Sequence, residues 1–172
     1  MTVRGVALRV VAAIVVATAL PIAVLRYVPP LTTAFMLAHK WPLARGGDAC
    51  DDILYEWVPR RAIGAVIAAE DQRFAVHHGF DFGAIGDAIE ELDAKGHSRG
   101  ASTISQQVAK NVFLWPGRSF VRKGLEAWLT IWIEALWPKH RILEVYVNVA
   151  QFGRCTFGVG AASRVFFRKP SS

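Results

Sequence analysis

Cysteine is scarce in this sequence, with only Cys50 and Cys155 among 172 residues. Two cysteines so far apart exclude a disulfide-rich scaffold and a cysteine-ligated zinc site. They can still pair with each other in an oxidising compartment, and the sequence leaves that question open. Nucleotide-binding fingerprints are also absent, because no glycine-rich loop follows a strand pattern and no GxxxxGK[ST] motif occurs.

Charged residues are few, at 20% of the chain against 53% hydrophobic residues, and the mean hydropathy is +0.29. That composition excludes a disordered chain, and the length suits one domain with its own core. Residues 99–172 hold 11 basic and 3 acidic side chains, whereas residues 27–98 hold 6 basic and 11 acidic ones. A basic C-terminal half favours an anionic ligand or surface, and a solvated basic face is the alternative.

The N-terminal segment contains a long apolar run. A helix over Gly5–Leu25 would be about 31 Å long, which matches the hydrocarbon core of a membrane. Arg4 and Arg9 favour a cytoplasmic N-terminus and an anchor over residues 5–26, with everything after it exported. A cleavable signal peptide is the alternative, since residues 17–19 have the A-x-A form, and a soluble core helix is the third.

Three regions are therefore expected: a cytoplasmic N-terminus over residues 1–4, a transmembrane anchor over residues 5–26 and a globular domain over residues 27–172. Residues 27–38 form a second apolar stretch that is too short to span a membrane. This stretch either lies in the membrane interface or packs on the domain as an ordinary helix.

Helical periodicity dominates the globular part and strands are scarce, so the predicted fold class is mainly α. Ser102 or Thr103 is expected to cap one helix, and Ser119 another. An apolar side is expected on one helix, formed by Phe82, Ile85, Ala88, Ile89 and Leu92. Helices are expected over residues 62–69, 81–95, 102–113, 119–137, 138–148 and 161–167, with 141–148 assigned to structural support.

One group of chemistry-bearing residues begins at Glu70 and Asp71 and runs on through His77. Glu70 ends an apolar helix, where partial burial would prepare a carboxylate as a general base or acid. An acidic pair at a solvated helix end is the alternative. His77 is a ligand or a base, or else a structural histidine, which is the more common case for a single histidine.

A second group lies within residues 100–111. Thr103, Gln106, Gln107 and Lys110 recur at i, i+3, i+4 and i+7. This spacing predicts one helix face that is rich in hydrogen-bonding groups and ends in a cation, which suits a sugar or a phosphate. A polar surface face is the alternative interpretation.

A third group is basic. Lys110, Arg118, Arg122 and Lys123 lie within fourteen positions and together could neutralise a pyrophosphate. Glu126 follows Arg122 by four residues, so it is either a carboxylate inside this cationic group or one partner of an ordinary helix salt bridge.

Four motifs carry a resemblance to a known family: EDQRFAVHHGFD, GASTISQQVAKN, RSFVRKGLE and RILEVYVN, in this order and spacing. They resemble the peptidoglycan glycosyltransferases of glycosyltransferase family 51. More narrowly, the chain is similar to monofunctional biosynthetic peptidoglycan transglycosylases, which are single-pass membrane enzymes without a penicillin-binding domain. The resemblance runs from the anchor through Phe167. It implies a lysozyme-like α fold with a small membrane-proximal jaw.

The implied reaction transfers a growing lipid-linked glycan onto the 4-hydroxyl of lipid II, with inversion and release of undecaprenyl diphosphate. The implied partners are lipid II, the nascent glycan chain, the membrane and other cell-wall synthesis or division proteins, with no nucleic acid. The resemblance also implies an inner-membrane protein whose catalytic domain lies on the periplasmic side.

The resemblance implies roles for individual residues. Glu70 is the expected general base, and Lys110 and Arg118 are the expected pyrophosphate-binding cations. Glu126 is the expected second carboxylate, acting on the leaving group directly or through Mg²⁺ or Mn²⁺, with no cofactor obligatory. Further substrate-binding residues are expected at Ser102, Thr103, Gln106, Gln107, Asn111, Arg122 and Lys123. The loop that carries Glu70 is expected to be shaped by Asp71, Phe74, His77 and Gly79.

The sequence departs from the family pattern in two places. Gln151 stands where an acidic residue is typical, and Arg154 and Cys155 stand where a Gly-rich turn is typical. The sequence also stops at Ser172, before further helices that complete the larger lobe in the family, so a shortened domain is expected. Two rival interpretations are a muramidase or lytic transglycosylase, which has no need of the basic group, and a truncated, non-catalytic lipid II-binding membrane protein.

Overall fold

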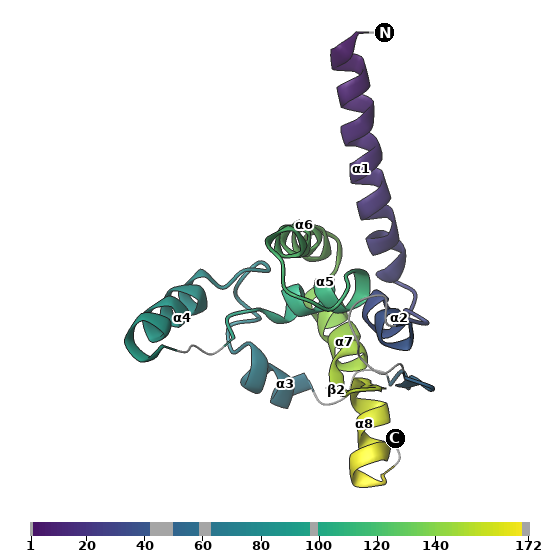
Figure 1. The fold of residues 1–172 in the computed structure, drawn as a ribbon, viewed down its shortest axis with the longest axis vertical. Coiled ribbons are helices and arrows are strands. Elements are labelled where there is room, and N and C mark those ends of the chain that lie inside the picture. The colour runs from purple at the N-terminus through teal and green to yellow at the C-terminus, as the bar shows by residue number, and fades with distance from the viewer. Residues whose placement is uncertain (1, 42–49, 59–62, 97–99, 170–172) are drawn as a thin grey trace.

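The computed structural model describes residues 2–41, 50–58, 63–96 and 100–169 (Figure 1). Within these residues, the helices are α1 Val3–Leu25, α2 Ala34–Lys40, α3 Ile63–Glu70, α4 Phe82–Lys95, α5 Ile104–Phe113, α6 Phe120–Leu136, α7 Lys139–Val149 and α8 Gly158–Phe167. The strands in the same residues are β1 Leu54–Tyr55, β2 Gln151–Gly153 and β3 Thr156–Phe157. The predicted mainly α class is confirmed.

Side-chain caps set where two central helices begin. The Ser119 hydroxyl accepts a hydrogen bond from the backbone N–H of Arg122 at 3.1 Å, so α6 starts directly after it. Thr103 caps α5 by accepting from the N–H of Gln106, whose Oε1 accepts in return from the N–H of Thr103 at 3.0 Å. This reciprocal capping box satisfies two backbone donors that the helix itself leaves unpaired. Of the two caps considered for α5, Thr103 is the one used.

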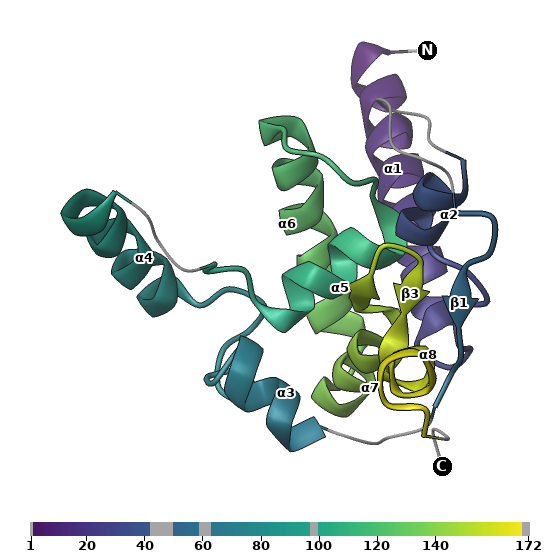
Figure 2. The ribbon, with the colours of Figure 1, turned by 60° about the horizontal axis from the view of Figure 1, so that its bottom comes forward.

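The core lies where α5, α6 and α7 pack together (Figure 2). Its fully buried side chains include Ile104 and Val108 of α5, Ile133 of α6, and Ile142 and Val145 of α7. In α6, Leu129 is buried against this core, whereas Val121 is 73% exposed.

Residues 141–148 support the structure, as predicted. The Arg141 guanidinium donates to the carbonyl oxygens of Leu25 at 2.8 Å and Val28 at 2.9 Å. The Asn148 amide accepts from the N–H of Val58 at 2.7 Å and donates to its carbonyl oxygen at 2.8 Å. Helix α7 therefore holds the chain after α1 and the segment before α3 by hydrogen bonds to their backbones.

Helix α1 extends away from the body of the molecule and is long and apolar enough to cross a membrane (Figure 1). Only 6% of its 18-residue apolar window is buried, so the interpretation as a soluble core helix is wrong. Its C-terminal part contacts α6 and the turn after it, where Trp137 Nε1 donates to the carbonyl oxygen of Ile22 at 2.6 Å. Membrane anchors and signal sequences share this length and composition.

The second apolar stretch packs on the domain. Thr33 caps α2, and Phe35 and Met36 bury their side chains with Phe157 in a small second core. Of the two alternatives for residues 27–38, the ordinary packed helix is therefore correct for α2. Residues before it remain exposed, Leu31 at 92%.

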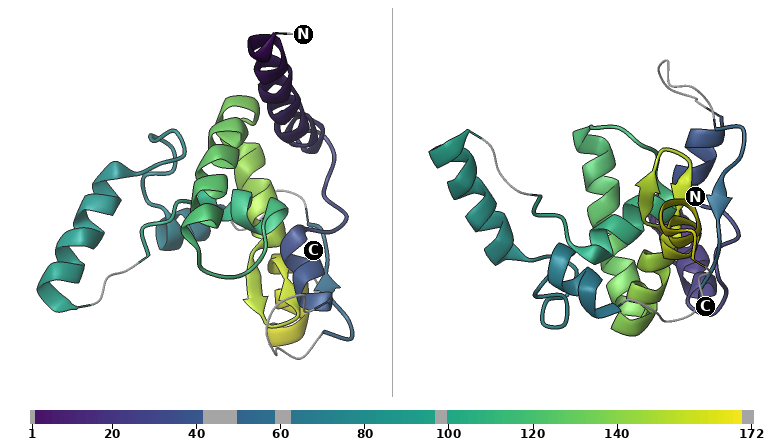
Figure 3. Two further views of the ribbon diagram at one scale, coloured as in Figure 1. Left: turned by 45° about the horizontal axis from the view of Figure 1, so that its top comes forward. Right: turned by 90° about the horizontal axis from the view of Figure 1, so that it is seen from below.

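Helix α4 stands apart from the body of the molecule in every view (Figures 1 and 3). Its apolar side is largely in solvent: Phe82 is 78% exposed, Ile89 56% and Leu92 51%. Ala88 is the one buried residue of this helix. The amphipathic pattern predicted the helix, but that side does not enter the core.

A three-stranded sheet of order β1-β3-β2 lies beside α8, with β1 parallel and β2 antiparallel to β3. A disulfide bond joins Cys50, before β1, to Cys155, before β3. The question that the sequence left open is answered: the two cysteines pair. Cys155, which stands where a Gly-rich turn is typical of the family, thus forms a disulfide that links the segments before β1 and β3.

Replacing Cys155 with serine is expected to lower the free energy of unfolding by about 2–4 kcal/mol, because the disulfide closes a long loop and restricts the unfolded chain. Urea unfolding with and without reductant measures this. Reduced wild-type protein should match the variant, whereas equal midpoints for oxidised wild type and the Cys155→Ser variant would contradict the expectation.

Candidate active site

Glu70 is the last residue of α3, and its side chain is exposed. The expectation of partial burial is therefore wrong: α3 ends at the edge of an open cleft, so the carboxylate faces solvent. Its Oε2 accepts a hydrogen bond from Gln107 Nε2 at 3.0 Å. The other end of the same amide, Gln107 Oε1, accepts from the Tyr146 hydroxyl at 3.3 Å.

The cleft beside Glu70 has a volume of about 470 Å³. Three segments form it: the end of α3 with the loop that follows, the start of α4, and the segment before α5. It is lined by Ala69, Glu70, Asp71, Gln72, Arg73, Asp81, Ala84, Asp87, Gly100, Ala101, Ser102, Thr103 and Gln107.

The basic group begins at the rim of this cleft. Lys123 Nζ donates to the hydroxyl of Ser102, a lining residue, at 3.2 Å and also pairs with Glu126. Arg122 Nη1 lies 3.0 Å from the other oxygen of Glu126, which is only 2% exposed. The expected i, i+4 salt bridge between Arg122 and Glu126 is present, and Lys123 adds a second cation to the same carboxylate. Arg122 is buried as well.

Lys110 interacts electrostatically with both carboxylates, Glu70 and Glu126. The pKa of its ammonium group is lowered, mainly by burial. The Glu126 and Glu70 carboxylates act against this shift, whereas the positive charges of Arg122 and Lys123 add to it. Because Lys110 interacts with both, the expected general base Glu70 and the basic group around Glu126 lie in the same region of the molecule. Arg118 is exposed in the segment that joins α5 to α6, directly before the Ser119 cap.

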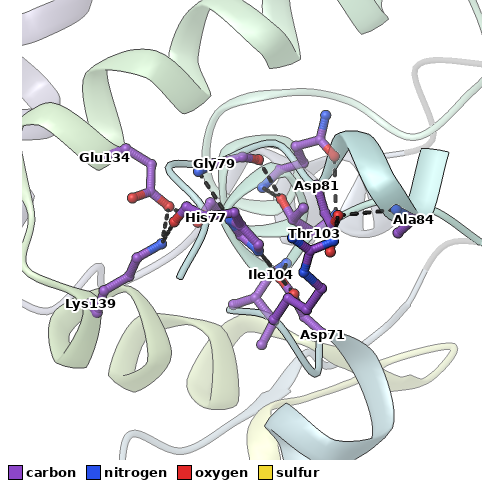
Figure 4. A network of polar contacts seen from close by, with 12 residues as sticks. Asp71, His77, Gly79, Asp81, Ala84, Thr103, Ile104, Glu134 and Lys139 are labelled. Carbon is purple, nitrogen blue, oxygen red and sulfur yellow. Dashed lines mark hydrogen bonds and ion pairs between the residues drawn. The ribbon is translucent and has the colours of Figure 1, made fainter. Parts of the chain in front are cut away.

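The loop after Glu70 is held by a buried network (Figure 4). The Asp71 carboxylate accepts from His77 Nε2 at 2.9 Å and from the N–H of Ile104 at 3.0 Å. His77 Nδ1 accepts from the N–H of Gly79 at 3.2 Å, and the Thr103 hydroxyl donates to the Gly79 carbonyl at 2.7 Å. His77 is thus a structural histidine with both ring nitrogens in use.

A second layer behind this loop was missed by the sequence reasoning. Lys139 Nζ donates to the His77 carbonyl at 2.7 Å, pairs with Glu134 at 2.8 Å and lies 4.4 Å from the centre of the Phe74 ring. Ser105 donates to the same Glu134 oxygen. Glu134 and Lys139 are on different helices, five positions apart, so no i, i+4 pattern marks them as partners.

The predicted hydrogen-bonding face of α5 is divided by the structure. Thr103 and Gln106 are 3% and 5% exposed, because their side chains close the capping box. Asn111 is 4% exposed, on the buried side of the helix. Gln107 and Lys110 are the more open members. Gln107 donates to Glu70, and Lys110 interacts electrostatically with Glu70 and Glu126.

Glu126 is the residue that the resemblance linked to a divalent metal. Both of its oxygens already accept from cations, Arg122 and Lys123, whereas Mg²⁺ requires several oxygen ligands in an octahedral arrangement. In the described part of the chain, no three His, Cys, Asp or Glu side chains gather as a metal site. The donor set therefore does not fit a protein-held metal.

The described residues thus form a helical domain in which Glu70 lines a cleft and Lys123 of the basic group contacts Ser102 at the rim of that cleft. The chain belongs to the Transglycosylase family, whose family model matches residues 47–172.

Three relatives are named biosynthetic peptidoglycan transglycosylase. The one from Pseudomonas aeruginosa is 53% identical over 85% of this chain and 65% of its own length. The one from Shewanella frigidimarina is 51% identical over 84% of this chain and 62% of its own length. A Xylella fastidiosa relative is 64% identical over 61% of this chain. This chain spans less than two thirds of the length of each of these relatives, 43% in the Xylella case.

Replacing Gly79 with alanine is expected to lower the free energy of unfolding by about 1–3 kcal/mol. Gly79 has φ +90, and an added Cβ would lie 2.8 Å from a Thr130 methyl carbon. The matched control is Gly86→Ala in α4, where an added Cβ meets nothing within 4 Å and alanine favours the helix. Urea unfolding compares the two, and equal losses would argue against a constrained loop.

Proposed function

We propose that this chain is a peptidoglycan glycosyltransferase that lengthens glycan chains from lipid II. The observation that carries the proposal is the contact of Lys123 with both regions: its ammonium donates to Ser102, which lines the cleft beside Glu70, and it pairs with Glu126 inside the cationic group. Membership of the Transglycosylase family and the names of the relatives support the same reaction class.

Glu70 is the general base in this proposal. Its carboxylate removes the proton of the 4-hydroxyl of the acceptor lipid II, and the oxygen attacks C1 of the donor sugar. The bond from C1 to the diphosphate oxygen breaks, and the electron pair leaves with undecaprenyl diphosphate. Attack from the face opposite the leaving group inverts the configuration at C1. A sugar hydroxyl is a weak nucleophile near neutral pH, so a positioned base contributes about 10²–10⁴ in rate.

The cationic group stabilises the leaving group. Diphosphate departs with negative charge, and fixed positive charges at that place replace a proton donor. Lys110, Arg118, Arg122 and Lys123 supply the charge, and Arg122 Nε is a buried donor with no hydrogen-bond partner among the described residues. A phosphate oxygen would satisfy such a donor. The positive charge in this proposal comes from side chains and not from a protein-held Mg²⁺ or Mn²⁺.

The proposed location is the bacterial cytoplasmic membrane, with α1 retained as a single anchor and the domain on the outer side. Arg4 and Arg9 at the start of α1 favour an N-terminus in the cytoplasm. The Cys50–Cys155 disulfide supports the same orientation, because disulfides persist in oxidising compartments and are rare in the cytosol. Enzyme and lipid-linked substrate would then meet at one membrane surface.

Glu70→Gln is expected to lower lipid II polymerisation by at least about 10²-fold, because the amide cannot accept the hydroxyl proton. The assay follows labelled lipid II in detergent micelles into glycan chains, using the full chain. Glu90→Gln on the exposed side of α4 is the matched control and should retain activity.

The same assay separates the rival functions. A wild-type chain that binds lipid II but forms no glycan would be a binding protein. Release of fragments from finished cell wall, without polymerisation of lipid II, would indicate a muramidase or lytic transglycosylase. Full activity of Glu70→Gln would remove Glu70 from the role of base.

Lys110→Arg is expected to move the alkaline limb of the pH profile of kcat/KM to higher pH. Burial lowers the pKa of Lys110, so raising the pH removes its charge earlier than for an exposed lysine. Arginine stays protonated throughout that range. Lys169→Arg is the control, and an unchanged alkaline limb in Lys110→Arg would show that another group sets it.

A further inference from the structure

The described contacts of Glu70 include a hydrogen-bonded chain that leads into the core. We infer that Tyr146 is a positioning residue for Glu70, acting through the Gln107 amide; this inference rests on the proposed function. Tyr146 is on α7, Gln107 on α5 and Glu70 at the end of α3, so three helices contribute one residue each.

The two ends of the Gln107 amide make this chain directional. The Tyr146 hydroxyl donates to Gln107 Oε1 at 3.3 Å, and Gln107 Nε2 donates to Glu70 Oε2 at 3.0 Å. If the amide turned over, its oxygen would face the carboxylate and its NH₂ group would face the hydroxyl. A tyrosine that donates to the oxygen end favours the orientation in which the NH₂ group supports the Glu70 carboxylate.

Tyr146 remains a donor over the working pH range. Burial raises the pKa of its hydroxyl, and the charge of the nearby Glu70 carboxylate raises it further. A protonated hydroxyl is what the amide oxygen requires. The side chain is 6% exposed and belongs to the main core, so its position is fixed by packing.

The exposed carboxylate needs such a support. Glu70 lies in solvent at the end of α3, and α3 contacts the body of the molecule through α7. A side chain held only by its own rotamer would sample several orientations, whereas a base must lie within hydrogen-bond reach of the hydroxyl it deprotonates. The Tyr146–Gln107 chain links this exposed group to buried residues of α5 and α7.

Other charged groups around Glu70 come from each neighbouring segment. Lys110 of α5 interacts with it electrostatically. Asp71 and Arg73 from the following loop and Asp81 and Asp87 from the α4 side line the same cleft. The Asp71 carboxylate accepts a hydrogen bond from His77, and Arg73 forms a salt bridge with Asp81 at 3.2 Å. The described hydrogen bond to the Glu70 carboxylate from α5 is that of Gln107, which Tyr146 orients.

The test measures kcat and KM for lipid II polymerisation by the full-length Tyr146→Phe variant. Losing the hydroxyl is expected to lower kcat about tenfold with KM little changed, the size expected for one lost hydrogen bond in a buried chain.

Tyr55→Phe is the matched control. Its hydroxyl is also partly buried, donating to the Pro30 carbonyl at 2.8 Å, and burial raises its pKa to about 12. This variant loses an equivalent hydroxyl away from Glu70, so it should keep the wild-type kcat and KM. An equal loss of kcat in both variants would reflect a general structural change and would overturn the inference.

A double-mutant cycle with Gln107→Ala gives a second measurement. Without the amide, Tyr146→Phe should cause no further loss of kcat, because its effect passes through Gln107. Additive losses, or a wild-type kcat in Tyr146→Phe, would overturn the inference and leave the proposed function standing. Wild-type protein that forms no glycan would overturn the proposed function itself.

Discussion

The buried carboxylate of Asp71 joins two segments that are 33 residues apart along the chain, and the cleft depends on this junction. It accepts from the His77 ring at 2.9 Å and from the N–H of Ile104 at 3.0 Å. A buried carboxylate without donors is costly, so both donors must remain in place. Because Glu70 precedes Asp71 directly, the same bonds that anchor Asp71 to the start of α5 also place Glu70 beside Gln107.

Mutual repulsion of like charges is the second constraint. Arg122 and Lys123 are adjacent in the sequence, and both pair with Glu126, which is almost fully buried. The carboxylate keeps the two cations together at the side of Lys110, whose ammonium is already disfavoured by burial. In the proposed reaction, this arrangement offers a concentrated positive charge to a diphosphate without needing a metal ion held by the protein.

Much of the secondary structure was predictable, because its signals are local. The caps at Thr103 and Ser119 act over three residues, so a short window of sequence contains both partners. The apolar run of α1 and the helical repeat of α7 are likewise properties of one continuous segment. The four motifs also predicted the family. They marked Glu70 as a candidate at the end of a helix, directly before a loop.

Which side chains meet was decided by the tertiary structure. The i, i+4 spacing does not reveal that the Gln106 side chain caps the start of its own helix, whereas the Gln107 side chain donates to Glu70. It also could not show that Tyr146 reaches that same amide from another helix, or that Cys50 meets Cys155. The sequence by itself determined helices, caps, the apolar anchor-like segment and the family. Burial and pairing depend on the packing of segments that are distant along the chain, and no local pattern encodes that packing.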